Sequence, residues 1–348
     1  FDHQKCVENN MGLNIELMTV FVMLGPMVFL TLTIYGWDFY LQNISMNLSF
    51  VCNFVVLCNL MYEIEPTPKS LEQQRLRKDL LRKHCAGVNQ SLFNLNNIEF
   101  NNFIVDDQHG IIYCYIPKVA CTNWKRTLIA LRQKEPYPDP MSFKDNWVHK
   151  FDTFQLLKHY SMPERKAKLK HYTKFLFVRD PFVRLISAYR DKMLNYDQYF
   201  YEGYIRVILQ RYKNQKGVPV KYNGTKKTDL KPSFHNFVQY IVDPRSEKYA
   251  PFEPHWRQMH RLCHPCLVEY DFVGHQESLQ EDAQQLLNIL KLENAIKFPP
   301  SHENMTSGNS VMEWFQGVPI EDRRKLYKIY EKDFQLFGYR RPTELLDD

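Results

Sequence analysis

Two short loops constrain the fold of this chain more than any other feature, because each stands between an apolar run and a helical pattern. The first loop reads PKVACTNWKR at residues 117–126 and follows the apolar residues 111–116. The second reads RDPFVRLIS at residues 179–187 and follows the apolar part of residues 174–178. Short runs of β-branched and aromatic residues are typical of buried strands. The sequence therefore predicts two strand-loop-helix units of an α/β fold with a parallel sheet.

Both loops have the residues of an anion-binding site. Backbone N–H groups at the start of a helix converge on one place, and the helix dipole favours negative charge there. Lys118 adds a positive charge to the first loop, while Arg179 can bind a phosphate through two parallel hydrogen bonds and Ser187 can donate its hydroxyl. Asp180 and Pro181 suit the N-cap and the first position of the second helix. Two separate anion sites fit a donor with two anionic ends.

The first loop is not an ATP-binding loop of the Walker A type. Such a loop needs glycines and a terminal Gly-Lys-Ser/Thr, whereas residues 117–126 contain no glycine and their first lysine is Lys118. A kinase-like nucleotide enzyme is an alternative that the missing magnesium-ligand motif disfavours. ATP turnover that requires a divalent metal would support that alternative, and we expect no metal at the site.

The chain resembles the Golgi carbohydrate sulfotransferases in both loops, and within them the chondroitin/dermatan 4-O-sulfotransferase group. The resemblance covers about residues 100–340. It includes EPHWR at residues 253–257, LCHPC at 262–266 and YDFVG at 270–274. It implies an α/β, P-loop-like sulfotransferase fold with a central parallel sheet flanked by helices and preceded by an N-terminal transmembrane helix.

The same resemblance implies that the chain transfers a sulfuryl group from 3′-phosphoadenosine 5′-phosphosulfate to the 4-hydroxyl of N-acetylgalactosamine in chondroitin, and also in dermatan. Lys118 is expected to neutralise the leaving phosphate. His255 is the leading general base, since histidine titrates near neutral pH, with Glu253 and His264 as rivals. The resemblance assigns donor binding to Pro117, Lys118, Val119, Ala120, Cys121, Thr122 and Asn123 at the 5′-phosphosulfate, and to Arg179, Asp180, Pro181, Phe182, Val183, Arg184, Leu185, Ile186 and Ser187 at the 3′-phosphate.

Two other functions stay open. One is 4-O-sulfation of terminal N-acetylgalactosamine on protein-linked glycans, whose enzymes more often have KAGCSNW where this chain has KVACTNW at residues 118–124. The other is a membrane protein that binds glycans without catalysis, which the intact Lys118, Arg179 and Ser187 disfavour. The expected partners are chondroitin chains on proteoglycans.

An apolar segment near the N-terminus predicts a membrane anchor. Residues 17–37 carry no charge, and their length is close to the ~20 residues that span a bilayer. The predicted organisation is a tail at residues 1–16, which begins with Phe rather than Met and is incomplete, then the anchor, a stem at residues 38–98 and a luminal sulfotransferase domain at residues 99–348.

Potential glycosylation sites favour a luminal C-terminal portion. The pattern Asn-x-Ser/Thr occurs at Asn43, Asn47, Asn89, Asn223 and Asn304. A second uncharged stretch at residues 39–62 is either part of the stem or a second span. With the resemblance, these patterns predict a single-pass type II protein of the Golgi membrane.

Charge pattern, motifs and cysteine spacing disfavour a nucleic-acid-binding protein and a zinc site. The formal net charge is +6 and the basic residues cluster, which suits the donor and a polyanionic glycan. No nucleic-acid-binding motif occurs, so nucleic acid is not an expected partner, and no pattern indicates an oligomeric state.

Eight cysteines suit an oxidising lumen. Cys263 and Cys266 lack a second Cys-x-x-Cys, so a structural disulfide or buried thiols are favoured over zinc.

Overall fold

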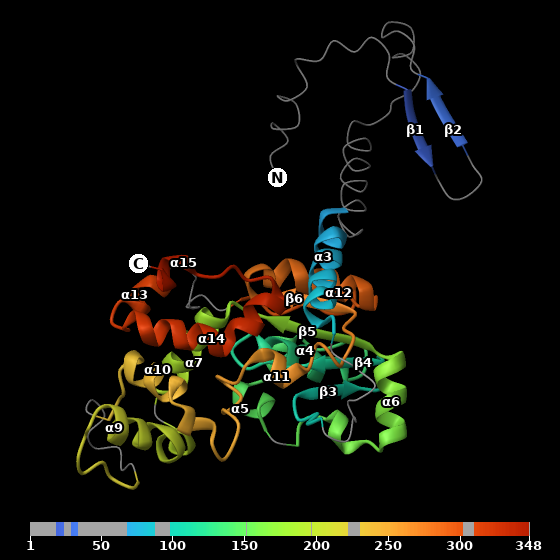
Figure 1. The fold of residues 1–348 in the computed structure, drawn as a ribbon. Coiled ribbons are helices and arrows are strands. Elements are labelled where there is room, and N and C mark those ends of the chain that lie inside the picture. The colour runs from blue at the N-terminus through green and yellow to red at the C-terminus, as the bar shows by residue number, and fades with distance from the viewer. Residues whose placement is uncertain are drawn as a thin grey trace, which may run out of the picture. The chain divides into compact units, whose positions relative to one another are not determined.

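A computed structural model describes residues 19–23, 29–33, 68–87, 98–150, 152–195, 197–221, 230–301 and 310–347. The chain divides into two units, residues 1–64 and 65–348 (Figure 1). In the first unit, β1 (Thr19–Met23) and β2 (Phe29–Thr33) form an antiparallel hairpin, with Thr19 opposite Thr33.

The helix expected to span a membrane at residues 17–37 is not found. The hairpin lies in this range, and among the described residues no helix has the length and apolar character that a bilayer crossing requires. The segment is rich in Val, Phe, Leu and Thr, most of which favour strands, and Gly25-Pro26 disfavours a continuous helix. The five Asn-x-Ser/Thr sites and residues 39–62 lie outside the described residues.

A four-stranded sheet forms the centre of the second unit. Its order is β3 (Phe103–Asp106), β4 (Ile111–Cys114), β5 (Thr173–Val178) and β6 (Phe272–His275). Strands β4, β5 and β6 are parallel, whereas β3 pairs antiparallel with β4. The predicted α/β class and central sheet are confirmed, and β3 adds an antiparallel edge.

Helices flank this sheet, and a second group of helices, to the left in Figure 1, lies beside it. Those of the described residues are α3 (Pro68–Cys85), α4 (Cys121–Leu131), α5 (Asp145–Val148), α6 (Met162–His171), α7 (Pro181–Lys192), α8 (Gln198–Phe200), α9 (Arg206–Tyr212), α10 (Phe234–Val242), α11 (Met259–Cys263), α12 (Leu279–Leu290), α13 (Val311–Phe315), α14 (Ile320–Phe337) and α15 (Thr343–Leu346). A π-helical turn at Tyr201–Ile205 joins α8 to α9. The helical spacing of Leu326, Tyr330, Phe334 and Phe337 predicts a helix at residues 320–337, and α14 has these bounds.

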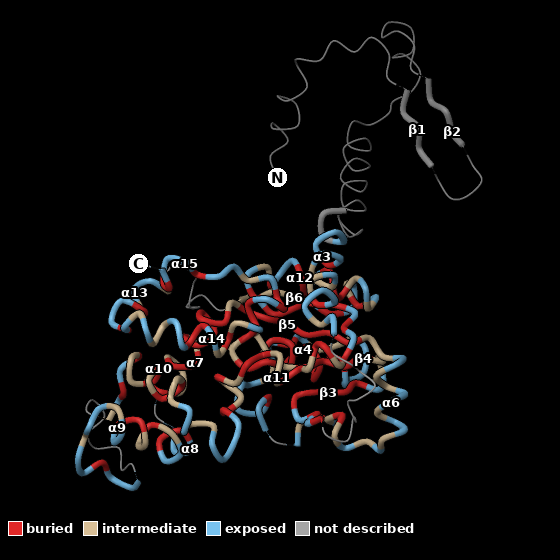
Figure 2. The backbone as a smooth tube through the Cα atoms, in the orientation of Figure 1, coloured by how far each residue is buried: buried red, intermediate tan, exposed pale blue. Residues whose placement is uncertain are grey.

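The apolar core has two clusters, one around the sheet and one among α7, α9, α10 and α14. Figure 2 shows the sheet strands buried along nearly their whole length. In the first cluster Tyr113 stacks on Phe175 with ring centroids 4.7 Å apart, and Trp124 lies 4.8 Å from the Phe175 ring. A Cβ at Gly274 would lie 2.2 Å from the Phe177 ring, so glycine is required at this point of β6.

Helix α3 lies in the range predicted as a stem and is bound to the second unit's core. The Gln74 side chain donates to the Val273 carbonyl at 3.0 Å and accepts from its N–H at 3.1 Å. Arg77 pairs with Asp282 at 2.9 Å, and both side chains are buried. These contacts join α3 to β6 and α12.

Two disulfides connect distant parts of the chain. Cys85 pairs with Cys266, and Cys114 pairs with Cys263. The expectation of a structural disulfide at Cys263 and Cys266 is confirmed, but each binds a remote partner instead of the other. Because both sulfurs are used, neither cysteine is available as a zinc ligand.

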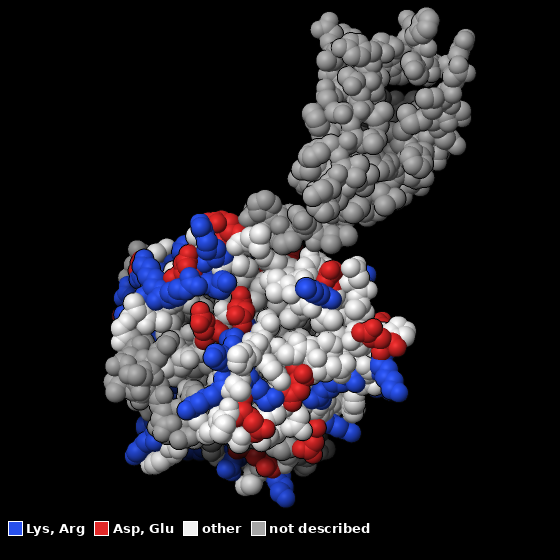
Figure 3. All heavy atoms as spheres, turned by 90° about the vertical axis from the view of Figure 1, so that its right-hand side faces the viewer, with Lys and Arg blue, Asp and Glu red and all other residues white. Residues whose placement is uncertain are grey.

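Basic residues at 165–174 do not make a surface of one sign. Lys168 pairs with Asp107, and Lys174 pairs with Asp271 at 2.7 Å. On the face shown in Figure 3, Lys and Arg are interspersed with Asp and Glu. Local pairing therefore neutralises part of the predicted basic surface.

Candidate active site

The first loop leaves β4 and turns sharply into α4. Lys118 and Ala120 have φ values of 71° and 48°, in the left-handed region that residues other than glycine rarely adopt. The sequence of residues 127–132 predicts a helix, but the helix already begins at Cys121. Within the described residues no side chain caps it. The first N–H groups of α4 are therefore oriented as donors to an anion.

The second loop leaves β5 and enters α7. Asp180 is the N-cap, as predicted, and its carboxylate accepts from the N–H groups of Phe182 and Val183 at 2.8 and 2.9 Å. Burial raises the pKa of Asp180 to about 6, although these two hydrogen bonds oppose the shift. Arg179 Nη1 donates to the Lys118 carbonyl at 3.2 Å, so the two loops touch. Both loops follow the carboxyl ends of neighbouring parallel strands, where α/β folds bind ligands.

Both loops line a cavity of about 780 Å³. The predicted residues that line it are Pro117, Lys118, Ala120, Cys121, Thr122, Asn123, Arg179, Ser187 and His255. The other predicted donor-binding residues do not line it. Of these, Asp180 caps α7 and the buried ones are Val119, Pro181, Phe182, Val183, Arg184, Leu185 and Ile186.

Arg184 holds three backbone segments together instead of facing the cavity. Its residue is 1% exposed. The guanidinium donates to the carbonyl oxygens of Pro117 at 3.0 Å, Pro254 at 2.8 Å and Arg257 at 2.8 Å. These bonds join the first loop to the segment that carries His255, which is a structural role and not an anion contact.

The cavity holds an ion-pair network that the sequence analysis missed. Lys118 Nζ lies 2.8 Å from Asp191 Oδ2, and Lys192 Nζ lies 3.2 Å from the same oxygen. Burial alone would raise the pKa of Asp191, but the bond and charge of Lys118, together with Lys192, outweigh burial and hold the pKa below its usual range. Ser187, Arg190 and Asp191 are spaced i, i+3 and i+4 on α7, so helical periodicity could have found the last two.

His255 lines the same cavity and is oriented by Glu253. Its Nδ1 lies 2.9 and 2.8 Å from the two carboxylate oxygens of Glu253, and its backbone N–H donates to the same carboxylate at 2.7 Å. Because a carboxylate only accepts, Nδ1 carries the proton and Nε2 is left as an acceptor. Burial lowers the pKa of His255 below its usual range, although Glu253 opposes this shift. A neutral histidine with a free Nε2 can act as a general base. The rival His264 does not line this cavity.

His149 also faces the first loop, and nothing in its local sequence indicated this. Its Nε2 lies 3.1 Å from Thr122 Oγ1. Burial and the charge of Lys125 lower the pKa of His149 to about 4, so the ring is neutral at pH 7. It adds a polar, uncharged side chain to the cavity wall.

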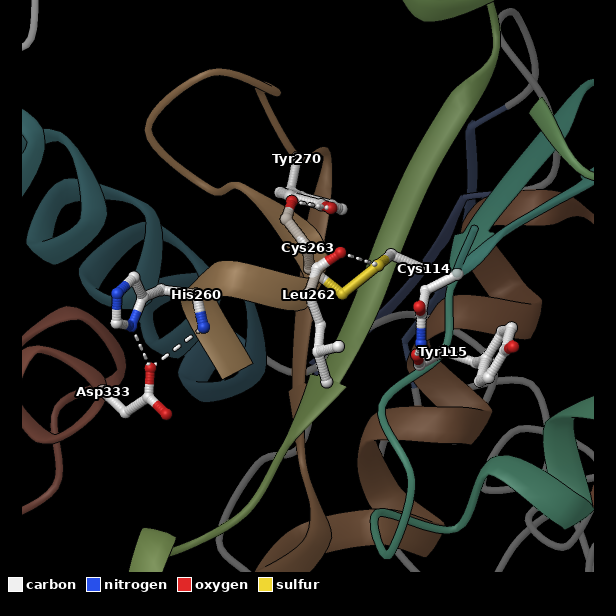
Figure 4. Close-up of a disulfide and its surroundings, with 8 residues drawn as sticks. Cys114, Tyr115, His260, Leu262, Cys263, Tyr270 and Asp333 are labelled. Atoms are coloured by element: carbon white, nitrogen blue, oxygen red, sulfur yellow. Dashed lines mark hydrogen bonds and ion pairs between the residues drawn. A yellow bond between two sulfur atoms is a disulfide. The ribbon is translucent and has the colours of Figure 1, made fainter. Parts of the chain in front are cut away.

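Helix α11, which follows the His255 segment, is fastened at both ends (Figure 4). At its start the buried Asp333 of α14 accepts from the backbone N–H of His260 at 2.9 Å and from the ring at 2.6 Å. At its end Cys263 is joined to Cys114 of β4, and Tyr270 donates to the Cys263 carbonyl at 2.6 Å. The strand that leads into the first loop and the segment that carries His255 are therefore covalently linked.

The sequence of the chain matches known sulfotransferases. The pattern of the sulfotransferase family matches residues 101–340. Carbohydrate sulfotransferase 12 of Mus musculus is 45% identical over 306 residues, which cover 82% of this chain and 73% of the relative. The Xenopus laevis protein of the same name is 46% identical over 270 residues, 74% of this chain and 64% of the relative. Carbohydrate sulfotransferase 11 of Rattus norvegicus is 36% identical over 276 residues, 78% and 77% of the two chains.

No solved structure matches the chain. The matched range contains both loops, the cavity's ion-pair network and the His255–Glu253 pair. The chain belongs to the sulfotransferase family and is a carbohydrate sulfotransferase.

Proposed function

We propose that the protein transfers a sulfuryl group from 3′-phosphoadenosine 5′-phosphosulfate to the 4-hydroxyl of N-acetylgalactosamine in chondroitin, and also in dermatan. The family implies this donor. The observation that carries the proposal is that both anion-binding loops and the His255–Glu253 pair meet at one cavity. A donor with two anionic ends and an acceptor hydroxyl can both be held there.

The donor's two ends match two groups of side chains. Lys118 and the N–H groups at the start of α4 are suited to the 5′-phosphosulfate. Arg179 and Ser187, which line the same cavity, are suited to the 3′-phosphate. Charge and hydrogen-bonding capacity thus fit the donor at both ends.

The proposed reaction is an in-line displacement at sulfur. The acceptor hydroxyl oxygen forms a bond to sulfur while the bond from sulfur to the bridging oxygen breaks, and adenosine 3′,5′-bisphosphate leaves. Nε2 of His255 takes the hydroxyl proton, and Glu253 stabilises the resulting imidazolium. Lys118 neutralises charge that develops on the bridging oxygen. As in phosphoryl transfer, positioning and charge stabilisation supply most of the rate.

The acceptor assignment is supported by the sequence of the first loop. KVACTNW at residues 118–124 resembles the chondroitin/dermatan group more than the enzymes that sulfate terminal N-acetylgalactosamine. The latter acceptor is the second candidate.

The test is sulfate transfer from labelled donor by the purified protein. Desulfated chondroitin, desulfated dermatan and a glycan ending in N-acetylgalactosamine serve as parallel acceptors, with disaccharide analysis of the products. We expect label at the 4-position of N-acetylgalactosamine within chondroitin. Transfer only to the terminal sugar would refute the acceptor assignment, and a protein that binds glycan without binding donor would refute catalysis.

We further propose that the protein resides in the Golgi membrane as a type II protein with its catalytic unit in the lumen. The two disulfides of the described residues, which join distant segments, suit an oxidising compartment. A C-terminal tag should co-localise with Golgi markers, resist protease in sealed vesicles and stay with the membrane in carbonate. A tag digested in sealed vesicles would contradict this orientation.

A further inference from the structure

Lys192 lines the cavity but belongs to neither donor-binding loop. It is the last residue of α7, and its side chain is 22% exposed. Its Nζ lies 5.0 Å from the centre of the Phe200 ring and 3.2 Å from Asp191 Oδ2. An aromatic face and a carboxylate therefore hold the ammonium in place while part of it stays accessible.

The same aromatic ring also contacts the general base. The centroids of Phe200 and His255 are 5.4 Å apart, with the rings edge to face. Lys192 and His255 thus lie against one side chain. Because both also line the cavity, an acceptor that offers its hydroxyl to His255 can extend a neighbouring sugar toward Lys192.

The charges around Asp191 leave Lys192 able to bind another anion. Asp191 has one negative charge against two lysines, and the ammonium of Lys192 has three N–H donors, of which the carboxylate oxygen accepts one. Lys118 makes the shorter contact, 2.8 Å against 3.2 Å for Lys192. Lys118 with the start of α4 and Arg179 with Ser187 are matched to the donor's anionic ends, and Lys192 belongs to neither group, so its remaining donors can bind an anion of the acceptor.

We propose that Lys192 binds the carboxylate of the uronic acid next to the N-acetylgalactosamine that is sulfated, and thereby favours acidic acceptor chains over neutral ones. This inference rests on the proposed function, because it assumes that the acceptor is a uronic acid polymer. Lys192 acts here as a specificity determinant. It takes no part in the proton transfer.

The test uses two acceptors that differ at one group, the carboxylate of the uronic acid. These are desulfated chondroitin and its carboxyl-reduced form, in which each carboxylate has become a hydroxymethyl group. The measured quantity is the ratio of kcat/KM for the two acceptors, with the KM for the donor determined in parallel. The variants are Lys192→Gln, Lys192→Arg and the control Lys248→Gln. Lys248 also lies 5.0 Å from an aromatic ring, that of Tyr249, but it is exposed and outside the cavity.

We expect Lys192→Gln to lower the acidic-to-neutral ratio about tenfold, as the loss of one partly buried charged contact would. Lys192→Arg should keep most of the preference, and Lys248→Gln should keep all of it. An unchanged ratio in Lys192→Gln overturns the inference. Equal losses on both acceptors with a raised donor KM also overturn it, since they would mean that Lys192 only supports Asp191 and Lys118. Failure of the unaltered protein to sulfate chondroitin despite donor binding would instead refute the proposed function.

Discussion

Replacement of Arg184 by methionine separates a structural role from an anion-binding role. The substitution keeps an unbranched apolar side chain but removes the donors to the carbonyl oxygens of Pro117, Pro254 and Arg257. Hydrogen bonds to a charged group contribute about 1.5–3 kcal/mol each, and the desolvation of one buried guanidinium offsets several kcal/mol of their sum. We expect a net loss of about 3–5 kcal/mol in the free energy of unfolding, a large fraction of a typical stability of about 5–15 kcal/mol.

The assay is thermal unfolding, together with the affinity for adenosine 3′,5′-bisphosphate. For a unit of this size, each kcal/mol shifts Tm by about 2–4 °C, so the Arg184→Met variant should unfold roughly 10 °C below the unaltered protein. Arg75→Met on α3 is the matched control. Its side chain is 69% exposed and pairs with Glu72 among the described residues, so we expect almost no change in Tm.

The structural reading fails if Arg184→Met unfolds at the normal temperature while its affinity for the bisphosphate falls tenfold or more. That result would mean that the guanidinium binds a phosphate, as expected from the sequence. A lower Tm with normal affinity in the variant that remains folded confirms that Arg184 holds the loops together.

Three further predictions follow from the site. Lys118→Ala should lower kcat about 10²–10³-fold with an unchanged Tm, and a near-normal rate in the folded variant would contradict its role. Because burial lowers the pKa of His255 from 6.5 and the base must be neutral, kcat/KM should be full above that pKa and be lost as the pH falls through it. An acid limb above pH 6.5 would contradict this assignment. The double variant Cys114→Ser, Cys263→Ser should lose about 2–4 kcal/mol of stability in urea unfolding, and an unchanged midpoint would show that the bond is dispensable.

Capping residues and apolar spacing predicted those helix boundaries that are set by residues close together in the sequence. The N-cap Asp180 and Pro181 gave the start of α7, and apolar spacing gave α14 with its bounds. Helix α4 was predicted to start too late, because Ala120 caps it in a left-handed conformation without a side-chain hydrogen bond. No residue preference indicates alanine at such a position.

Residues brought together by tertiary contacts were harder to predict. Both loops line one cavity, as expected from two strand-loop-helix units that each carry anion-binding residues. Lys192 lies beyond the second motif and was not identified from the sequence. His149 was missed because its contact with Thr122 joins segments 27 residues apart. The resemblance assigned Arg184 to the 3′-phosphate together with the rest of the second loop. Its burial depends on three backbone segments that no local pattern places side by side.

The two disulfides also set an order of events during synthesis. Each joins an early cysteine to a late one, with separations of 149 residues for Cys114–Cys263 and 181 residues for Cys85–Cys266. At translation rates of about 5–20 residues per second, Cys114 waits roughly 10–30 s for its partner. During that time Cys85 and Cys114 are both present without their native partners and can pair wrongly with each other. A chain that stops before residue 263 can form neither native bond, so its unpaired thiols distinguish an unfinished molecule from a complete one.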